Sequence, residues 1–179
     1  MPLPFALTQL IIAGGLCLAA AAWDLARRRI PNALVAAVLV EGLWAQATAG
    51  GGALAPLGAL AAAGLVLALL FPLWTRGGIG GGDVKFAFAA ATWVGLPRLP
   101  VFLLAGAMAG GLVAGACYLL SRDDARRTIR GNLWMALVLR QIPDAAATRA
   151  GAGRITVPYA LAIDVALFAA LFVRWTPAF

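Results

Sequence analysis

The chain has 179 residues, of which 63% are hydrophobic and 12% charged, with a formal net charge of +7. Soluble domains are about half apolar and a quarter charged, so this composition excludes an ordinary soluble domain and indicates a polytopic membrane protein of one domain. Histidine is absent, which excludes serine–histidine chemistry. The two cysteines, Cys17 and Cys117, lie inside apolar runs and are expected to be packing residues. We expect no metal and no cofactor.

Apolar runs of about 20 residues match the length of helix that crosses a bilayer. The sequence predicts about six such helices, of which the fourth is short. Their approximate bounds are 5–23, 33–49, 54–74, 84–95, 99–120 and 156–175. No Lys or Arg precedes the first run, so we expect it to be a retained transmembrane helix and not a cleaved signal peptide.

Residues 121–155 form a polar, arginine-rich segment between the last two runs. We expect it to be a cytoplasmic basic loop. Within it, the apolar stretch 133–139 is too short to cross a membrane. Such a stretch can lie against the lipid headgroups as an interfacial helix.

The distribution of basic residues predicts the orientation in the membrane. All Lys and Arg residues except Arg98 and Arg174 lie in the connections after the first, third and fifth runs or, as Lys85 does, at the edge of the run that follows. The positive-inside rule places these connections in the cytoplasm and both termini outside. Membrane topology thus explains the positive charge, and we do not expect nucleic acid as a partner. Tryptophans near the predicted helix ends are expected at the interfaces: Trp23, Trp74, Trp93 and Trp175.

A glycine-rich stretch precedes the fourth run. Residues 77–82 contain five glycines, and Asp83 follows them at the start of the apolar segment. Asp24 stands in a similar setting where the first run ends. An acid at the edge of an apolar segment is costly unless it has a partner or a function. The predicted topology puts both acids at the cytoplasmic side at similar depth, so we predict that they form a pair.

Two carboxyl groups brought close together cannot both ionise cheaply, so one holds a proton while the other stays charged. Such a pair can activate a water to attack a peptide carbonyl and can protonate the leaving nitrogen, without a metal. The glycines at 80–82 would let an extended substrate backbone approach Asp83. Alternatively, the stretch is an ordinary glycine turn whose aspartate caps the fourth helix. The residues alone leave both readings open.

Two further acids, Glu41 and Asp164, lie inside predicted runs. Intramembrane acids mark functional sites by default. We expect Asp164 to face the bundle in the outer half of the last run. Together with the predicted pair, these acids leave open a proton- or cation-coupled transporter or channel. Lys85, next to Asp83, is expected to support the site.

Three motifs carry a resemblance to a known family. The segment Gly80-Gly81-Gly82-Asp83-Val84-Lys85 is similar to the G-x-G-D-V-K motif of GxGD aspartyl proteases. Asp24 with the following Arg29-Ile30-Pro31-Asn32 resembles the first-aspartate motif, and Pro158-Tyr159-Ala160-Leu161-Ala162-Ile163 is similar to the C-terminal P-Y-x-x-A-[IL] segment. In this order and over nearly the whole chain, they resemble the prepilin peptidases, also called type IV leader peptidases.

The resemblance implies an all-α GxGD protease in the bacterial inner membrane that cuts the basic leader from prepilins at the cytoplasmic face. It assigns catalysis to Asp24 and Asp83 and a supporting or substrate-binding place to Gly80, Gly82, Lys85, Pro158 and Tyr159.

The larger members of that family carry a cytoplasmic zinc domain with paired cysteine motifs and also methylate the new N-terminus. This sequence has no such cysteine pairs. It looks like the short Tad/Cpa-type peptidases that process Flp prepilins, and we do not expect methylation. A non-enzymatic scaffold of a pilus export machine is a third hypothesis.

Overall fold

The computed structural model describes residues 7–27, 29–49, 52–76, 79–120, 126–127 and 159–172. All regular structure within these ranges is helical. The helices are α1 (Leu7–Arg27), α2 (Asn32–Thr48), α3 (Ala55–Thr75), α4 (Gly81–Leu120) and α7 (Tyr159–Phe172). The all-α class is therefore confirmed. The predicted interfacial helix at 133–139 lies outside the described residues.

Three of these helices, α1, α3 and α4, are long and apolar enough to cross a membrane. Helices α2 and α7 are apolar but shorter. Large aliphatic side chains cover the outside of the bundle, including the exposed Leu18, Leu65 and Leu112. Such a surface is stable in lipid and not in water. The chain is therefore a membrane protein, while the count of six spans stays a prediction.

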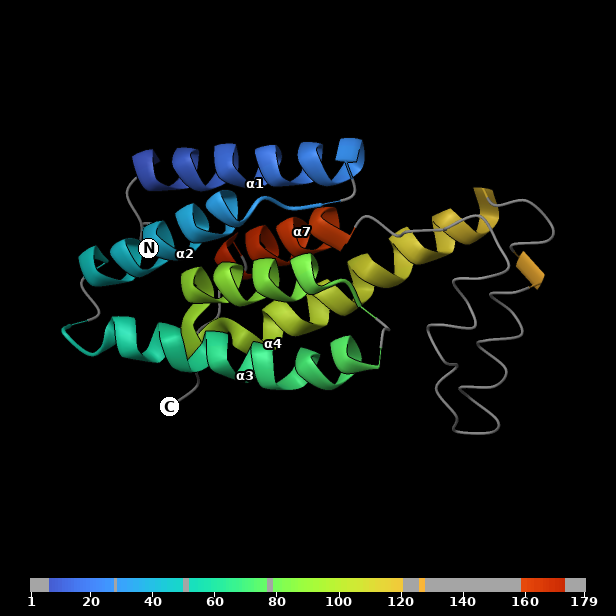
Figure 1. Ribbon diagram of the computed structural model, residues 1–179. Helices are drawn as coiled ribbons and strands as arrows, with labels where there is room; N and C mark the ends of the chain where they lie inside the picture. Colours follow the sequence, from blue (N-terminus) through green and yellow to red (C-terminus); the bar gives the residue numbers. More distant parts are fainter. Residues whose placement is uncertain are drawn as a thin grey trace.

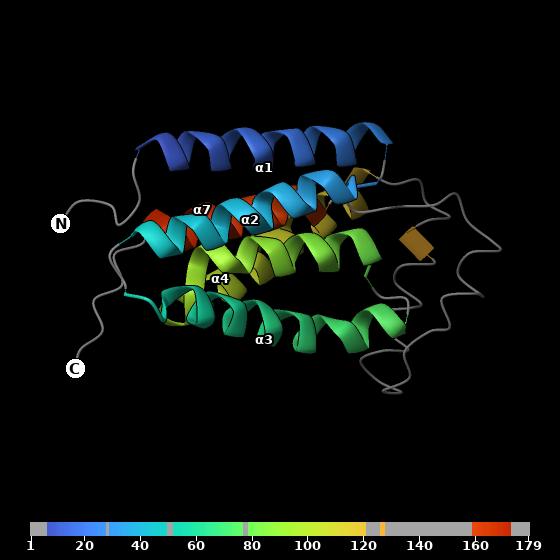
Figure 2. The ribbon, with the colours of Figure 1, turned by 60° about the vertical axis from the view of Figure 1, so that its left-hand side comes forward.

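The helices lie side by side as a bundle with α4 in the middle (Figures 1 and 2). Helix α4 packs against α2, α3 and α7, whereas α1 packs against α2 and α7 only. The helix directions alternate, so the last turns of α1 and α3 lie at the same end of the bundle as the first turns of α2, α4 and α7. We call this end the site end.

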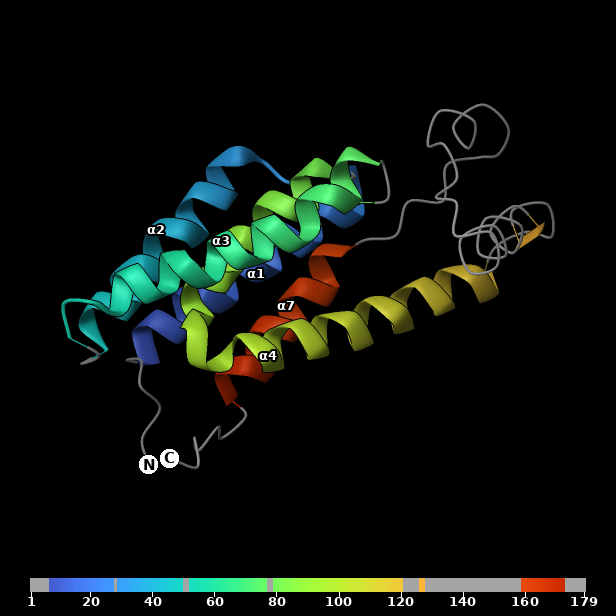
Figure 3. The same ribbon diagram turned by 90° about the horizontal axis from the view of Figure 1, so that it is seen from below.

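Helix α4 breaks at Gly95, where the sequence predicts one helix to end before the next begins. The backbone there has φ +66° and ψ 176°, a left-handed φ that glycine adopts without strain. Beyond the break the helix turns back along α7 (Figure 3). Pro97 has no N–H for the carbonyl of Trp93, four residues earlier. The Gln46 side chain of α2 instead donates to the carbonyls of Trp93 (2.8 Å) and Thr92 (3.2 Å).

Replacing Gln46 should therefore weaken the bundle. In Gln46→Met, which keeps the length of the side chain, the carbonyls of Thr92 and Trp93 lose their amide donor. We expect a loss of about 1–3 kcal/mol, the cost of leaving a partly buried acceptor unsatisfied. Thermal unfolding in detergent measures it, with the exposed neighbour Ala47→Met as the control. Equal melting temperatures for the two variants would show that the amide contributes nothing.

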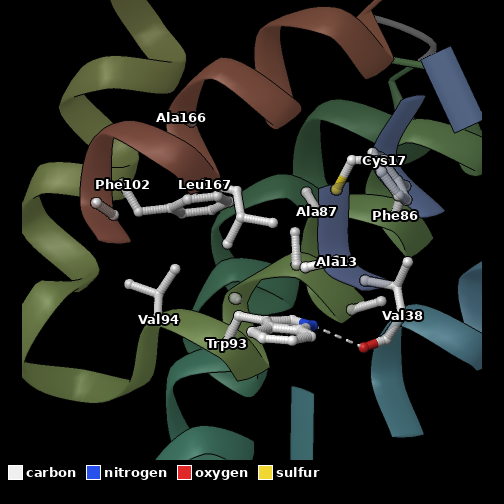
Figure 4. Close-up of a cluster of buried hydrophobic side chains, with 14 of the residues drawn as sticks. Ala13, Cys17, Val38, Phe86, Ala87, Trp93, Val94, Phe102, Ala166 and Leu167 are labelled. Atoms are coloured by element: carbon white, nitrogen blue, oxygen red, sulfur yellow. Dashed lines mark hydrogen bonds between the residues drawn. The ribbon is translucent and has the colours of Figure 1, made fainter. Parts of the chain in front are cut away.

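The core is built mainly from alanine, with a few large side chains such as Trp93, Phe86 and Leu167. Trp93 is completely buried, and its Nε1 donates to the Val38 carbonyl at 3.1 Å (Figure 4). The expectation of an interfacial Trp93 is therefore wrong. It lies two residues before the break at Gly95. Here Gly42 of α2 lets the two helices come close, because a Cβ at Gly42 would lie 2.6 Å from Trp93 Cδ1.

Candidate functional site

Asp24 lies in the last turn of α1 and is buried, with 6% of its surface exposed. It ends a stripe of buried residues at helical spacing that faces the rest of the bundle. The stripe consists of Gln9, Leu10, Ala13, Cys17, Ala20, Ala21 and Asp24. The periodicity of α1 therefore turns this carboxyl inward. On the outside of the same turn, Arg27 stacks over the Trp23 ring at 4.5 Å.

Asp83 is the third residue of α4. Its carboxyl accepts a hydrogen bond from the backbone N–H of Gly80, which directly precedes the helix. In return, the Gly80 carbonyl accepts the N–H of Val84 at 3.2 Å. An acid at this position that reaches back to the residue before the helix forms half of a capping box. Asp83 is therefore not the N-cap residue that the alternative expected, because it lies inside the helix, and its bond to Gly80 fixes the direction of the carboxyl.

The two motif glycines have different surroundings. A Cβ at Gly80 would lie 2.7 Å from Asp83 Oδ2, too close for any real side chain. A Cβ at Gly82 would lie at ordinary contact distance, 3.8 Å from the backbone nitrogen of Ile30. Gly80 thus leaves room for the carboxyl, while Gly82 places the first turn of α4 beside the segment that follows Asp24.

The two acids approach each other at the site end. Their carboxyl groups are close enough to interact as like charges, although no Cα atom of α1 lies within 8 Å of a Cα atom of α4. Tyr159, the first residue of α7, is also within electrostatic reach of Asp83. The Tyr159 ring packs beside Gly110 in the second part of α4. Three helices therefore contribute side chains to this place.

The other candidate residues lie apart from the pair. Lys85 is exposed, and its ammonium group makes no hydrogen bond or ion pair within the described ranges. Pro158 lies outside the described residues. Glu41 is half-buried in α2. Asp164 faces the bundle as predicted, with 7% of its surface exposed. It is five residues from the start of α7 and thus nearer to the site end than to the other end of that helix, and whether this is the inner or the outer half stays a prediction.

Basic residues surround the site end. Those in the described ranges are Arg27, Arg29, Arg76, Lys85, Arg126 and Arg127. The Arg126 guanidinium donates to the carbonyls of Tyr118, at 3.2 Å, and Leu119, where α4 ends. A cation at the carboxyl end of a helix also complements its dipole. In the part of the chain that the structure describes, no three Cys, Asp or Glu side chains gather in a possible metal site.

The fold and the site together define an all-helical membrane protein with two carboxyl groups near each other at one end of its bundle. The model of the type IV leader peptidase family matches residues 11–115. That range is more than half of the chain and contains both Asp24 and Asp83. The chain therefore belongs to the type IV leader peptidase family and is a peptidase. No curated protein and no solved structure gives a significant match.

Proposed function

We propose that this peptidase is an aspartic endopeptidase that removes the leader from prepilins at the cytoplasmic face of the membrane, with Asp24 and Asp83 as its catalytic residues. One observation carries the proposal. Two acids that are distant in the sequence come within electrostatic reach of each other at one end of an apolar bundle. The matched family is one of leader peptidases, so the expected substrate is a leader peptide bond.

The chemistry needs one proton shared by the pair. The ionised carboxylate takes a proton from a water as the water oxygen bonds to the scissile carbonyl carbon. The protonated partner gives its proton to the leaving nitrogen as the C–N bond breaks, and the pair then exchanges roles. The N–H of Gly80 holds the Asp83 carboxyl in place. No covalent intermediate is required.

The location of the pair agrees with a prepilin substrate. A prepilin carries its leader directly before an apolar helix, so the bond to be cut would lie at the membrane surface when that helix is in the bilayer. The site end is where apolar spans give way to basic connections, as expected of a cytoplasmic interface. We assign the site to the inner membrane of a bacterium and the substrate to the Flp type. Gly82, Lys85, Pro158 and Tyr159 are proposed to line or support the peptide path.

Cleavage of a Flp-type prepilin tests the function. The purified protein in lipid vesicles is mixed with a full-length prepilin, and the products are identified by mass spectrometry. We expect a single cut between the leader and the apolar helix. The control is a prepilin whose apolar helix is replaced by a soluble helix, which should remain intact. An intact prepilin in both reactions would argue against the function. Membership in a peptidase family favours this proposal over the transporter or scaffold hypotheses.

The two motif glycines should respond differently to alanine. Gly80→Ala puts a Cβ against Asp83 Oδ2 and must displace the carboxyl. A misplaced catalytic group costs up to about 100-fold in rate, so we expect kcat to fall at least tenfold. Gly82→Ala is the matched control, because its Cβ meets only ordinary contacts. We expect Gly82→Ala to keep its kcat, with any change in KM reporting on the substrate path. Equal kcat values for the two variants would contradict the assigned role of Gly80.

A further inference from the structure

A second polar contact lies inside the bundle, away from the proposed catalytic pair. The side chains of Cys17 on α1 and Asp164 on α7 share a hydrogen bond. Both are buried, with 1% and 7% of their surfaces exposed. The other oxygen of Asp164, Oδ1, is buried and has no hydrogen-bond partner within the described ranges. Placing an acid among apolar helices is costly, and packing alone would be served better by a leucine.

The contact fixes how α1 lies along α7. Two contacts define the register of this interface. Gly14 faces Phe168, at 3.8 Å from a Cβ on Gly14 to the ring, and Cys17 faces Asp164. A step of three residues toward the C-terminus of α1 thus corresponds to a step of four residues toward the N-terminus of α7. If this antiparallel register continues, Asp24 comes to lie just beyond the first residue of α7, at the site end.

Cys17 and Asp24 share one face of α1. They are seven residues apart, which is about two turns and about 10 Å along the axis, and both belong to the buried stripe. A shift or rotation of α1 at Cys17 would therefore be carried directly to the Asp24 carboxyl.

Helix α7, like α2, links α1 to α4. No Cα atom of α1 lies within 8 Å of α4, whereas α7 packs against both helices. At the α4 interface, a Cβ on Gly106 would lie 3.4 Å from the Cβ of Ala166. The relative position of the two catalytic acids is thus set in part through α7.

We propose that Asp164 is a positioning residue that, through its hydrogen bond with Cys17, holds α1 in register on α7 and so keeps Asp24 opposite Asp83. What this role requires is the shape and hydrogen-bonding capacity of the side chain, not its acidity. Its effect on turnover rests on the proposed aspartic mechanism, but the contact between α1 and α7 does not.

The test compares Asp164→Ala with Asp164→Asn in a Cys117→Ala background, so that Cys17 is the only thiol. The first readout is the rate at which N-ethylmaleimide alkylates Cys17 in the folded protein. We expect about fivefold faster alkylation in Asp164→Ala, the effect of losing one hydrogen bond on local opening. Asp164→Asn keeps an oxygen that accepts the thiol proton, so its rate should stay near that of the parent.

The second readout is prepilin cleavage. We expect kcat to fall about tenfold in Asp164→Ala with little change in KM, and to recover in Asp164→Asn. If Asp164→Asn loses as much activity as Asp164→Ala while Cys17 stays protected, the acid itself is needed and the positioning role is wrong. Unchanged alkylation and unchanged kcat in Asp164→Ala would also overturn it. If Asp164→Ala exposes Cys17 but the parent protein cleaves no prepilin, the proposed function fails and the contact between the helices stands.

Discussion

Asp24→Asn and Asp83→Asn should each abolish prepilin cleavage while leaving the protein folded. Asparagine keeps the size of the side chain but can neither take a proton from water nor give one to the leaving nitrogen. Removing a general acid or base costs about 10²- to 10⁴-fold in rate. Because the two groups act as one unit, the double variant should be no slower than either single variant, within the sensitivity of the assay.

Folding has to be separated from catalysis in this comparison. The Asp83 carboxyl also accepts a hydrogen bond from the N–H of Gly80. The side-chain oxygen of an asparagine can still accept this hydrogen bond. We therefore expect melting temperatures of both variants close to that of the parent protein. Glu41→Gln is the matched control, an intramembrane acid of α2 changed to its amide, and it should cleave normally. If either aspartate variant cleaves the prepilin at the rate of the parent protein, the replaced residue is not catalytic.

Gly42→Val should strongly destabilise the contact between α2 and α4. A Cβ at Gly42 would lie 2.2 Å from Thr92 Oγ1 and 2.6 Å from the Trp93 ring. Both neighbours are fully buried. The Trp93 indole is also held by the Val38 carbonyl, so it cannot move aside without breaking that bond. Overpacking of this kind costs about 1–3 kcal/mol or more, and we expect the upper end.

Gly64→Val is the control for this prediction. Gly64 lies in the middle of α3, and a Cβ there would meet nothing within 4 Å. The two variants share the same change in helix propensity and differ only in what the new side chain meets. Thermal unfolding in detergent, followed by tryptophan fluorescence, should show a lower melting temperature for Gly42→Val alone. A similar decrease in the melting temperature of both variants would assign the effect to helix propensity and not to the contact between α2 and α4.

Much of the fold could be predicted because its signals are local. The apolar runs gave the helices to within a few residues, and Gly95 with Pro97 marked the break in α4. The basic connections placed the ends of α1 and α3 at one end of the bundle, which the structure confirms. Asp24 and Asp83 were expected on the same side for this reason. Which face of the membrane that end occupies stays a prediction.

The features that sequence analysis missed depend on contacts between distant helices. Trp93 was expected at an interface because it stands near the end of an apolar run, and only its fit beside Gly42 places it in the core. The bond between Cys17 and Asp164 had no signal in either helix alone. Its one available clue was that Asp164 is an acid in a very apolar segment without a basic residue in reach along the chain.

The proposed site depends on Asp24 and Asp83 facing each other at the site end. It can be tested by replacing both with cysteine in a chain where Cys17 and Cys117 are alanine. A short bifunctional methanethiosulfonate reagent is then applied to the protein in membranes. Because the Cα atoms are more than 8 Å apart, a spacer is needed in place of a direct disulfide.

We expect an intramolecular cross-link between positions 24 and 83. The positive control joins positions 9 and 48, whose side chains hydrogen bond at 2.7 Å. The negative control pairs position 24 with position 98, beyond the break in α4. A cross-link at positions 9 and 48 with none at 24 and 83, with and without bound prepilin, would contradict the claim that the two acids form one site.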